Sequence, residues 1–481
     1  MSNTYIKPEE RKTILLISDD LRVTSGVGVM SRAIVYRTAE HFNWIQIGIL
    51  TKHNTELLKE IDISNEVNLE MGYKDASVKI YPDILYNNQF SNLNNLRKIL
   101  SLNKIDGILF FTDPRYYYWL FESELEIRQR IPLIYLNIWD NLPYPLWNKP
   151  FYESCDGLFA ISKQTYNINV QLIQDSIDEK VVKYIPHGIE NTYYPMNPSS
   201  PQLDEYKRKV FGNDIPKFIL LFNARNMNRK NMGDLVLGWK LFTDTLSDKD
   251  AVSCCLLMHC NPSSWDGTDI EAIWKDNSNT DRCKVKFLDY NMSFAEMNLM
   301  YNISDGVILP SYAEGWGLSI TEAMMTGKMF IATVTGGMQD QMRFEDENGN
   351  WITFSKDFPT NSIGKYKKHG DWCIPIFPIT ARSNGSPKNP YIYEDVIRIQ
   401  DIADAITKLY NIPKEKRIKL GDHGYQWATG EEAGFTASIM GERVVDGIEE
   451  VLNKFKPQNN YRIIKISPME NKINQDIIWR N

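Results

Sequence analysis

The stretch AEGWGLSITEAM, residues 313–324, contains two glutamates, Glu314 and Glu322, on either side of a Gly-Trp-Gly turn. It follows the apolar run GVILP (306–310), which is typical of a strand buried in a parallel sheet. In open α/β sheets, ligands bind at the carboxyl ends of the strands. The stretch therefore predicts an α/β fold with a candidate binding site between this strand and a following helix.

Two interpretations of this stretch stay open. Ser319 precedes Glu322 by three positions and matches a capping box, in which Glu322 would only satisfy a backbone donor at the start of a helix. Alternatively, Gly315 and Gly317 let backbone amides approach a ligand closely, and the helix N-terminus favours anionic groups such as phosphate. Carboxylates only accept hydrogen bonds, which suits sugar hydroxyl groups.

A basic segment, NARNMNRKN (223–231), follows the apolar run KFILLF in the same way. Arg225, Arg229 and Lys230 lie close together in it, and cations at a strand end would neutralise a diphosphate. The alternative is a solvated basic turn, because several basic residues in one loop are common. The coincidence with the glutamate segment favours a binding site.

The strand pattern extends in both directions from these segments. Continuous apolar runs alternate with amphipathic ones, and a polar stretch near residue 200 separates two groups of runs. The predicted strands lie at 13–18, 44–50, 106–111, 132–139 and 157–162 in the first group, and at 217–224, 253–259, 284–288, 306–310 and 328–333 in the second. The pattern predicts two α/β halves.

The segment from about 343 to 398 differs, because it is rich in Gly, Pro, Asn and aromatic residues. This composition predicts a long insertion with little helix. Helical spacing returns after it, followed by a polar tail from about residue 456. Ser293 followed by Glu296 matches a second capping box and predicts another helix start.

Bulk composition is that of a globular protein and argues against several kinds of partner and location. The chain has 481 residues, 43% hydrophobic and 24% charged, which is ordinary globular usage. Its formal charge of −7 provides no global positive field for a polyanion, so DNA is possible as a partner but not favoured. Six cysteines without paired CxxC spacing indicate reduced thiols and a cytoplasmic location. No apolar run of about 18 residues is present, so any membrane contact would be peripheral.

Taken together, these motifs resemble the retaining GT-B glycosyltransferases of family four, the glycosyl transferases group 1. The resemblance rests on the two glutamates of EGWGLSITEAMMTG, on NAR and RK within 223–230, on IPHGIENTYYP (185–195) and on SGVGVMSR (25–32). It implies a GT-B fold, with two Rossmann-like domains facing each other across a cleft.

The resemblance also implies a division of the chain into domains. Residues 1–195 would form an acceptor-binding domain, and residues 196–430 a nucleotide-sugar-binding domain with the loop-rich insertion at 343–398. Residues 431–481 would form a C-terminal helix and tail that can pack back on the first domain.

The resemblance assigns roles to the donor-side residues. Arg225 and Lys230 would hold the donor diphosphate, Glu314 the sugar hydroxyl groups and Glu322 the ribose. The backbone amides of Gly315, Trp316, Gly317 and Leu318 would contact the sugar and phosphates. Leu288 and Tyr290 are candidate base contacts, although a plain strand end is an equal alternative.

The N-terminal half gives weaker signals. Gly26 and Gly28 form a partial glycine motif that would contact the donor, or only a turn between strand and helix. Asp140 is a candidate catalytic residue together with Glu314, Arg225 and Lys230, or else a helix cap. Arg115, Tyr116 and Trp139 are candidate acceptor contacts, with core packing as the alternative for this aromatic run. His187 is a candidate hinge residue.

The predicted activity is retaining transfer of a sugar, a hexose by preference, from a UDP- or GDP-sugar to a hydroxyl group of a glycan, a lipid-linked sugar or a small molecule. Front-face attack would pass the acceptor's proton to the departing diphosphate. No metal site and no bound cofactor are expected, because no DxD-like pair is present and basic residues can replace the metal's charge. The alternatives are transfer to a hydroxymethylated DNA base, a phosphorylase or synthase of the same architecture, and a non-catalytic nucleotide- or sugar-binding protein.

Overall fold

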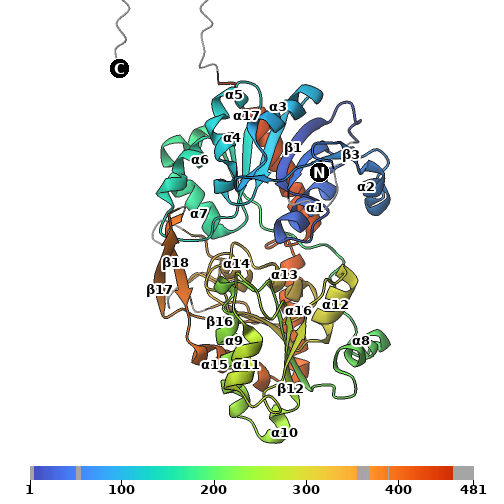
Figure 1. Ribbon diagram of the computed structural model, residues 1–481, viewed down its shortest axis with the longest axis vertical. Helices are drawn as coiled ribbons and strands as arrows, with labels where there is room; N and C mark the ends of the chain where they lie inside the picture. The colour runs from blue at the N-terminus through green and yellow to red at the C-terminus, as the bar shows by residue number, and fades with distance from the viewer. Residues whose placement is uncertain (1–4, 50–55, 355–365, 367, 388, 459–481) are drawn as a thin grey trace, which may run out of the picture.

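The computed structural model describes residues 5–49, 56–354, 366, 368–387 and 389–458. It contains two large β-sheets, one above the other in Figure 1, each with helices on its faces. The α/β class predicted from the alternating apolar runs is confirmed.

The first sheet has eight strands in the order β10-β9-β8-β7-β1-β2-β4-β3. All neighbours are parallel except β3 and β4. The bounds are β1 (Lys12–Asp19), β2 (Phe42–Ile49), β3 (Ile61–Asp62), β4 (Val78–Pro82), β7 (Gly107–Phe111), β8 (Leu133–Asn137), β9 (Gly157–Ala160) and β10 (Val181–Tyr184). A small hairpin, β5 (Leu85–Tyr86) and β6 (Gln89–Phe90), lies outside it.

The second sheet has six parallel strands in the order β13-β12-β11-β14-β15-β16. The bounds are β11 (Phe218–Asn223), β12 (Cys254–His259), β13 (Val285–Leu288), β14 (Gly306–Leu309), β15 (Phe330–Thr333) and β16 (Cys373–Ile376). The central strands of this sheet are buried on both faces, which explains why they appear in the sequence as continuous apolar runs. All ten predicted strands are present, whereas short strands such as β4 and β10 were not predicted.

Helices connect the strands of both sheets. In the first half they are α1 (Gly26–Thr38), α2 (Ser64–Met71), α3 (Leu93–Leu102), α4 (Tyr118–Glu122), α5 (Glu124–Ile127), α6 (Lys149–Glu153) and α7 (Lys163–Leu172). In the second half they are α8 (Pro201–Phe211), α9 (Met232–Asp244), α10 (Asp248–Ala251), α11 (Ile270–Asn277), α12 (Phe294–Ile303), α13 (Leu318–Met325), α14 (Met338–Met342), α15 (Ile399–Asn411) and α16 (Lys414–Thr429). Among the described residues, none of the helices has the length and apolar character needed to cross a bilayer.

The two predicted capping boxes have different outcomes. Ser293 and Glu296 cap α12 reciprocally, as predicted. The box expected at Ser319 and Glu322 is wrong, because α13 begins two residues earlier than such a box requires, directly after Gly317, and has no side-chain cap. Gly317 has φ of 88°, a conformation that glycine adopts without strain. Glu322 therefore lies inside the helix, and its carboxylate is available for another partner.

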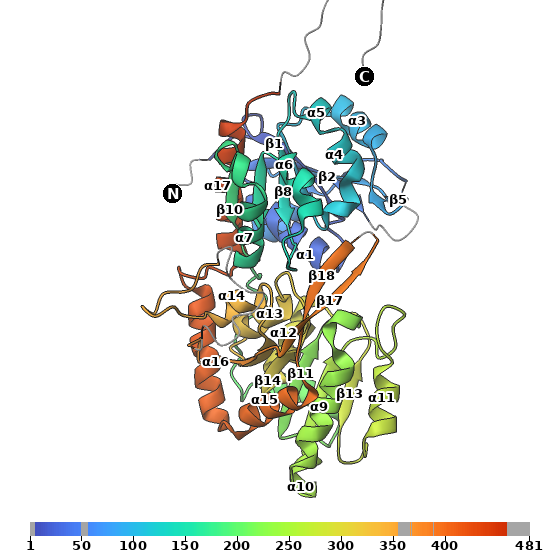
Figure 2. The same ribbon diagram turned by 90° about the vertical axis from the view of Figure 1, so that its left-hand side faces the viewer.

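The segment 343–398 is more structured than the predicted loop-rich insertion. Its described part has no helix, as predicted, but β16 joins the second sheet beside β15. The strands β17 (Thr380–Ser386) and β18 (Asn389–Val396) form an antiparallel hairpin at the boundary between the two halves (Figure 2). The sequence did not reveal the hairpin because most of its side chains are exposed, so no apolar run marks it.

The last helix, α17 (Ala437–Lys454), returns to the first half (Figures 1 and 2). Two glycines let it approach the sheet and α1 closely: a Cβ at Gly447 would lie 2.7 Å from the Phe159 ring, and one at Gly441 would lie 2.8 Å from Arg37. Helix α16 remains with the second half, so the chain crosses between the halves again before α17. The predicted polar tail lies mainly in 459–481, outside the described residues.

Candidate active site

A cavity of about 940 Å³ lies between the two sheets. Its walls come from the segments that follow β1, β8 and β9 in the first sheet, and β11 and β14 in the second. The carboxyl ends of the two parallel sheets therefore face each other across one cleft. This is the position at which open α/β sheets bind ligands.

A buried carboxylate with two cations lies on the second-sheet wall. The side chain of Glu314 is 5% exposed; its Oε2 lies 3.0 Å from Arg229 Nη1, and its Oε1 accepts a hydrogen bond from Lys230 Nζ. Burial alone would raise the pKa of Glu314, but the two cations outweigh it and lower the pKa to about 2. Glu314 is therefore ionised at ordinary pH, and the cluster of Glu314, Arg229 and Lys230 carries one net positive charge.

Glu322 is held at the end of β11. Its Oε2 accepts hydrogen bonds from the Tyr301 hydroxyl and from Asn223 Nδ2, the latter at 3.3 Å. Burial raises the pKa of Glu322 despite these donors. Asn223 also pairs with His259 Nδ1 at 2.8 Å, so a polar chain runs along the carboxyl edge of β11 and β12.

The Gly-Trp-Gly turn brings the two walls into contact. A Cβ at Gly315 would lie 2.9 Å from the carbonyl oxygen of Ile138 and 3.2 Å from the Ile161 side chain, both on the opposite wall. Trp316 is buried, and its Nε1 donates to Thr321 Oγ1 at 2.8 Å. Glycine at 315 is thus required for the close approach of the halves.

Two further titratable groups lie on the first-sheet wall. Burial raises the pKa of Asp140 to about 6, with Arg229 opposing this shift and Glu314 adding to it. Burial lowers the pKa of His187 to about 3, so His187 is neutral. The His187 ring lies between Phe111 and Trp316, with centroid distances of 5.8 Å and 6.3 Å, and thereby joins the two halves.

The structure brings most of the predicted site residues to the same cavity. Those that line it are Gly26, Asp140, Arg225, Lys230, Glu314, Gly315, Trp316, Gly317, Leu318 and Glu322. They differ in environment: the Lys230 side chain is 12% exposed, whereas that of Arg225 is 71% exposed and pairs with Asp266 at 2.8 Å.

The remaining predicted residues do not line the cavity. Gly28 lies in α1, where its amide donates to the Ser25 cap. Leu288 is buried, and Tyr290 is exposed with its carbonyl 3.0 Å from His259 Nε2; residues 291–294 line the cavity instead.

The predicted acceptor contacts also lie beside the cavity. Arg115 pairs with Asp113 and lies over the Trp139 ring, 5.8 Å from its centroid. Trp139 is buried and donates its Nε1 to the Asn141 carbonyl, and Tyr116 packs on Phe90. Core packing, the alternative considered for this aromatic run, describes their surroundings.

The cavity includes residues to which the sequence assigned no individual role. Among them are Tyr193, Asn223, His259, Ile392 and Glu394. The last two come from β18, which reaches the first half: Asn141 Nδ2 donates to the Tyr393 carbonyl at 2.9 Å, and the rings of Trp147 and Tyr391 lie 4.5 Å apart. Only their positions after or near predicted strands could have indicated Asn223 and His259, and no signal indicated β18.

In the part of the chain that the structure describes, no three His, Cys, Asp or Glu side chains gather as a metal site. All six cysteines are buried and unbridged.

Comparison with known proteins identifies the class to which this fold and cleft belong. Residues 282–358 match the family model of glycosyl transferases group 1. This match and the solved structures below confirm the resemblance to GT-B glycosyltransferases: the matched segment carries that family's signature, and the described part of the chain has the GT-B fold. No similar sequence was found among curated proteins.

Three solved structures illustrate the shared fold. HepE of Anabaena, in complex with UDP and glucose, is 14% identical with a TM-score of 0.61, covering 92% of this chain and 100% of its own. Sucrose-phosphate synthase of Thermosynechococcus elongatus is 13% identical with the same TM-score and the same coverage. A glycosyltransferase of Rickettsia africae is 17% identical with a TM-score of 0.56, covering 92% of this chain and 99% of its own.

Proposed function

We propose that the protein is a retaining glycosyltransferase that moves a sugar from a nucleotide diphosphate sugar to a hydroxyl acceptor. The observation that carries this proposal is the buried Glu314 with Arg229 and Lys230, facing Asp140 across the cleft. A net positive cluster at the carboxyl end of a sheet suits a diphosphate, and an ionised carboxylate beside it suits sugar hydroxyl groups.

The donor would bind the second-sheet wall. Lys230, with Arg229 and the more exposed Arg225, would neutralise the diphosphate, and the amides at the start of α13 would add hydrogen bonds. Glu322, fixed by Tyr301 and Asn223, would accept from the ribose. The complex of HepE with UDP and glucose supports a UDP-hexose as the first donor to test.

The acceptor would enter from the first-sheet wall. Attack of its hydroxyl oxygen on the anomeric carbon would break the bond to the diphosphate, and a diphosphate oxygen would take the hydroxyl proton. Lys230 and Arg229 would stabilise the charge that develops on the leaving group. The boundaries proposed for this division are 1–195 for the acceptor domain and 196–430 for the donor domain, with the segment from 431 onward returning to the first.

Asp140 would act at the boundary between the two substrates. It lies among residues that line the cleft and is electrostatically coupled to both Arg229 and Glu314. It would orient the transferred sugar or the acceptor hydroxyl group. The unbridged thiols are compatible with a reducing compartment such as the cytosol.

The first test is thermal unfolding of the full chain with UDP, GDP and their glucose conjugates, because a ligand of the folded state raises the melting temperature with concentration. We expect one nucleotide series to stabilise the protein, and the corresponding sugar nucleotide to be hydrolysed slowly without acceptor. Stabilisation without hydrolysis or transfer would instead indicate a non-catalytic binding protein. No stabilisation by any nucleotide would refute the donor site.

A further inference from the structure

A second, smaller cavity of about 90 Å³ lies at the opposite edge of the six-stranded sheet. Lys217, Asp305 and Lys328 line it, and each comes shortly before a strand: β11, β14 and β15. Helices α8 and α16 supply the remaining charged residues. The cavity is therefore at the amino ends of the strands, whereas the candidate active site is at their carboxyl ends.

The charges around this cavity are strongly unbalanced. Five cationic side chains and one carboxylate are among its lining residues: Lys207, Lys217, Lys328, Lys414, Arg417 and Asp305. Two of the cations are largely buried, since the side chain of Lys207 is 21% exposed and that of Arg417 is 9% exposed. Gathering like charges away from water is costly unless an opposite charge accompanies them.

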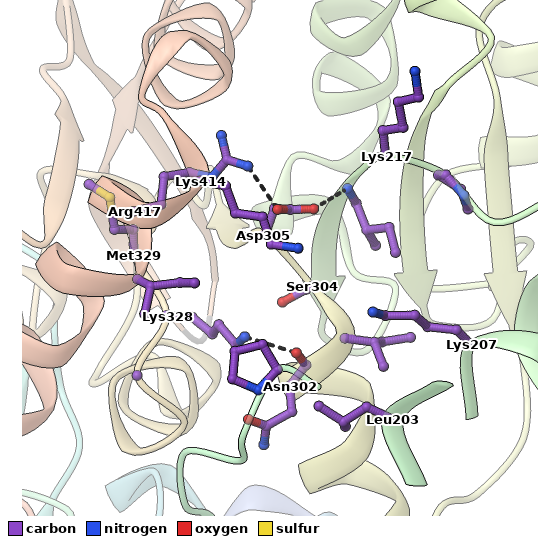
Figure 3. A pocket seen from close by; sticks show the side chains of 16 residues that line it. Leu203, Lys207, Lys217, Asn302, Ser304, Asp305, Lys328, Met329, Lys414 and Arg417 are labelled. Carbon is purple, nitrogen blue, oxygen red and sulfur yellow. Dashed lines mark hydrogen bonds and ion pairs between the residues drawn. The ribbon is translucent and has the colours of Figure 1, made fainter. Parts of the chain in front are cut away.

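The single carboxylate is already fully engaged. Asp305 Oδ1 accepts from Arg417 Nη2 at 2.8 Å, and its Oδ2 accepts from the backbone amide of Ile219 at 2.9 Å (Figure 3). Lys207 Nζ lies 3.9 Å from Asp204 Oδ1 in the same helix, whereas Lys217, Lys328 and Lys414 form no ion pair within the described part of the chain. Asp305 therefore neutralises Arg417, and these three lysines have no carboxylate partner.

Several donors lack an anionic partner. Lys328 Nζ donates to the neutral Asn302 carbonyl at 2.8 Å, and Arg417 Nε is buried without a hydrogen-bond partner among the described residues. In Figure 3, Lys207 and Lys328 extend toward the middle of the cavity from opposite sides. Burial lowers the pKa of Lys328 to about 8, and Lys207, Lys414 and Arg417 lower it further against the effect of Asp305. The cavity thus has a positive potential and donors that can reach an anion.

We propose that this cavity binds a tetrahedral oxyanion, namely inorganic phosphate or the phosphoryl group of a phosphorylated metabolite. The cavity is small, at about 90 Å³, and suits an anion of a few heavy atoms. The rest of a phosphorylated metabolite would remain at the surface. The phosphate oxygens would accept from Lys207, Lys328 and Arg417 Nε, and the anion would supply the charge that Asp305 does not.

The test is calorimetric titration of the full chain with inorganic phosphate. It is carried out in wild type, in Lys328→Met and in Lys230→Ala, because phosphate can also enter the main cleft. Loss of one charge-assisted contact is expected to weaken binding about 10- to 100-fold in Lys328→Met. Lys230→Ala should retain this binding event, which separates it from the proposed donor site.

A control variant and a second cavity variant test whether phosphate binds in this cavity. Lys240→Met removes an exposed lysine of α9 that pairs with Asp244, and it should leave phosphate affinity unchanged. If Lys328→Met fails to fold, Lys207→Met is the second variant, with the same expected weakening. Absence of binding at tens of millimolar phosphate, or equal affinity in wild type and the cavity variants, overturns the proposal. Competition by a sugar phosphate assigns the site to a phosphorylated metabolite, and failure of such competition assigns it to the free ion.

Discussion

The two walls of the cleft are built alike but differ in charge. Both are the carboxyl ends of parallel strands, yet the first-sheet wall mixes apolar and uncharged polar side chains, and Asp140 is its one carboxylate among the described residues, since His187 is neutral. The second-sheet wall carries Arg225, Arg229, Lys230, Glu314 and Glu322. The same fold therefore provides one wall rich in charged side chains and another with a single carboxylate.

The charge of the second wall is concentrated in two short segments. Residues 223–231 and 313–322 follow neighbouring strands, β11 and β14, so the segments meet in space although about 80 residues separate them. Packing between strands thus turns two local patterns into one cluster. The first wall has no such pair of charged segments among its lining residues, because the segments after β1 and β8 contribute one carboxylate, Asp140, and otherwise uncharged residues.

The largest expected effect tests whether the charged wall performs the chemistry. Glu314→Gln keeps the size of the side chain but removes a charge that is present at all ordinary pH values. We expect turnover of the sugar nucleotide to fall about 100-fold or more, the range seen when one preorganised electrostatic contact is lost. Initial rates give this number, and calorimetry should show UDP affinity unchanged or tighter because two cations lose their carboxylate. Full turnover in the variant would place the reacting sugar elsewhere.

The next effect concerns the two kinds of cation on the same wall. Lys230→Ala removes a largely buried charge and should weaken UDP binding about 10- to 100-fold. Arg225→Ala removes the more exposed cation of the same wall: its side chain is 71% exposed and pairs with Asp266, so we expect it to contribute less and UDP binding to weaken by less than about threefold. Isothermal titration calorimetry of both variants with UDP gives the two affinities to be compared. Equal effects would mean that the diphosphate lies farther out, toward Arg225.

A third experiment tests the contact between the walls with a pair of glycines. In Gly315→Ala the new Cβ would lie 2.9 Å from the Ile138 carbonyl, whereas in Gly26→Ala it would lie 3.4 Å from the flexible Leu318 side chain. We expect Gly315→Ala to lower transfer rates about tenfold by holding the halves apart, with Gly26→Ala nearly unchanged. The rates are compared at equal folded fraction, verified by circular dichroism. A loss in Gly26→Ala alone would show instead that the donor approaches the first wall at this glycine.

These contrasts explain how much could be predicted from the sequence. The strands were predictable because buried parallel strands appear as continuous apolar runs, and the two charged segments because each follows such a run. The role of Glu322 was ambiguous, because the spacing of a capping box does not show where the helix begins, and the helix starts directly after Gly317, two residues before the start that the spacing suggested. The contribution of β18 was not predictable, because its cleft residues depend on how an exposed hairpin docks near Asn141 and Trp147.

The pH dependence of stability provides a probe of the first wall. Because the folded protein holds the Asp140 proton more tightly than the unfolded chain, the free energy of unfolding falls as the pH rises from the ordinary aspartate pKa of 3.8 through about 6. Asp140→Asn removes this penalty. We expect its melting temperature, relative to wild type, to rise by roughly 2–4 °C between about pH 4 and about pH 7. A melting-temperature difference between Asp140→Asn and wild type that stays constant with pH would contradict the raised pKa of Asp140.

The smallest expected effect is that of a chelator. It tests whether basic side chains or a metal ion would neutralise the donor diphosphate at the second-sheet wall. Lys230 and Arg229 already supply positive charge where the diphosphate would lie, so a divalent cation would compete with them for the same oxygens. We expect EDTA to change the transfer rate by less than about twofold. In Lys230→Ala, by contrast, added Mg²⁺ should restore part of the lost UDP affinity, because the vacated position again needs a cation. If EDTA abolished wild-type activity and Mg²⁺ restored it, the basic residues alone would not be sufficient to neutralise the diphosphate. The positive charge of the second-sheet wall would then depend on a bound metal ion.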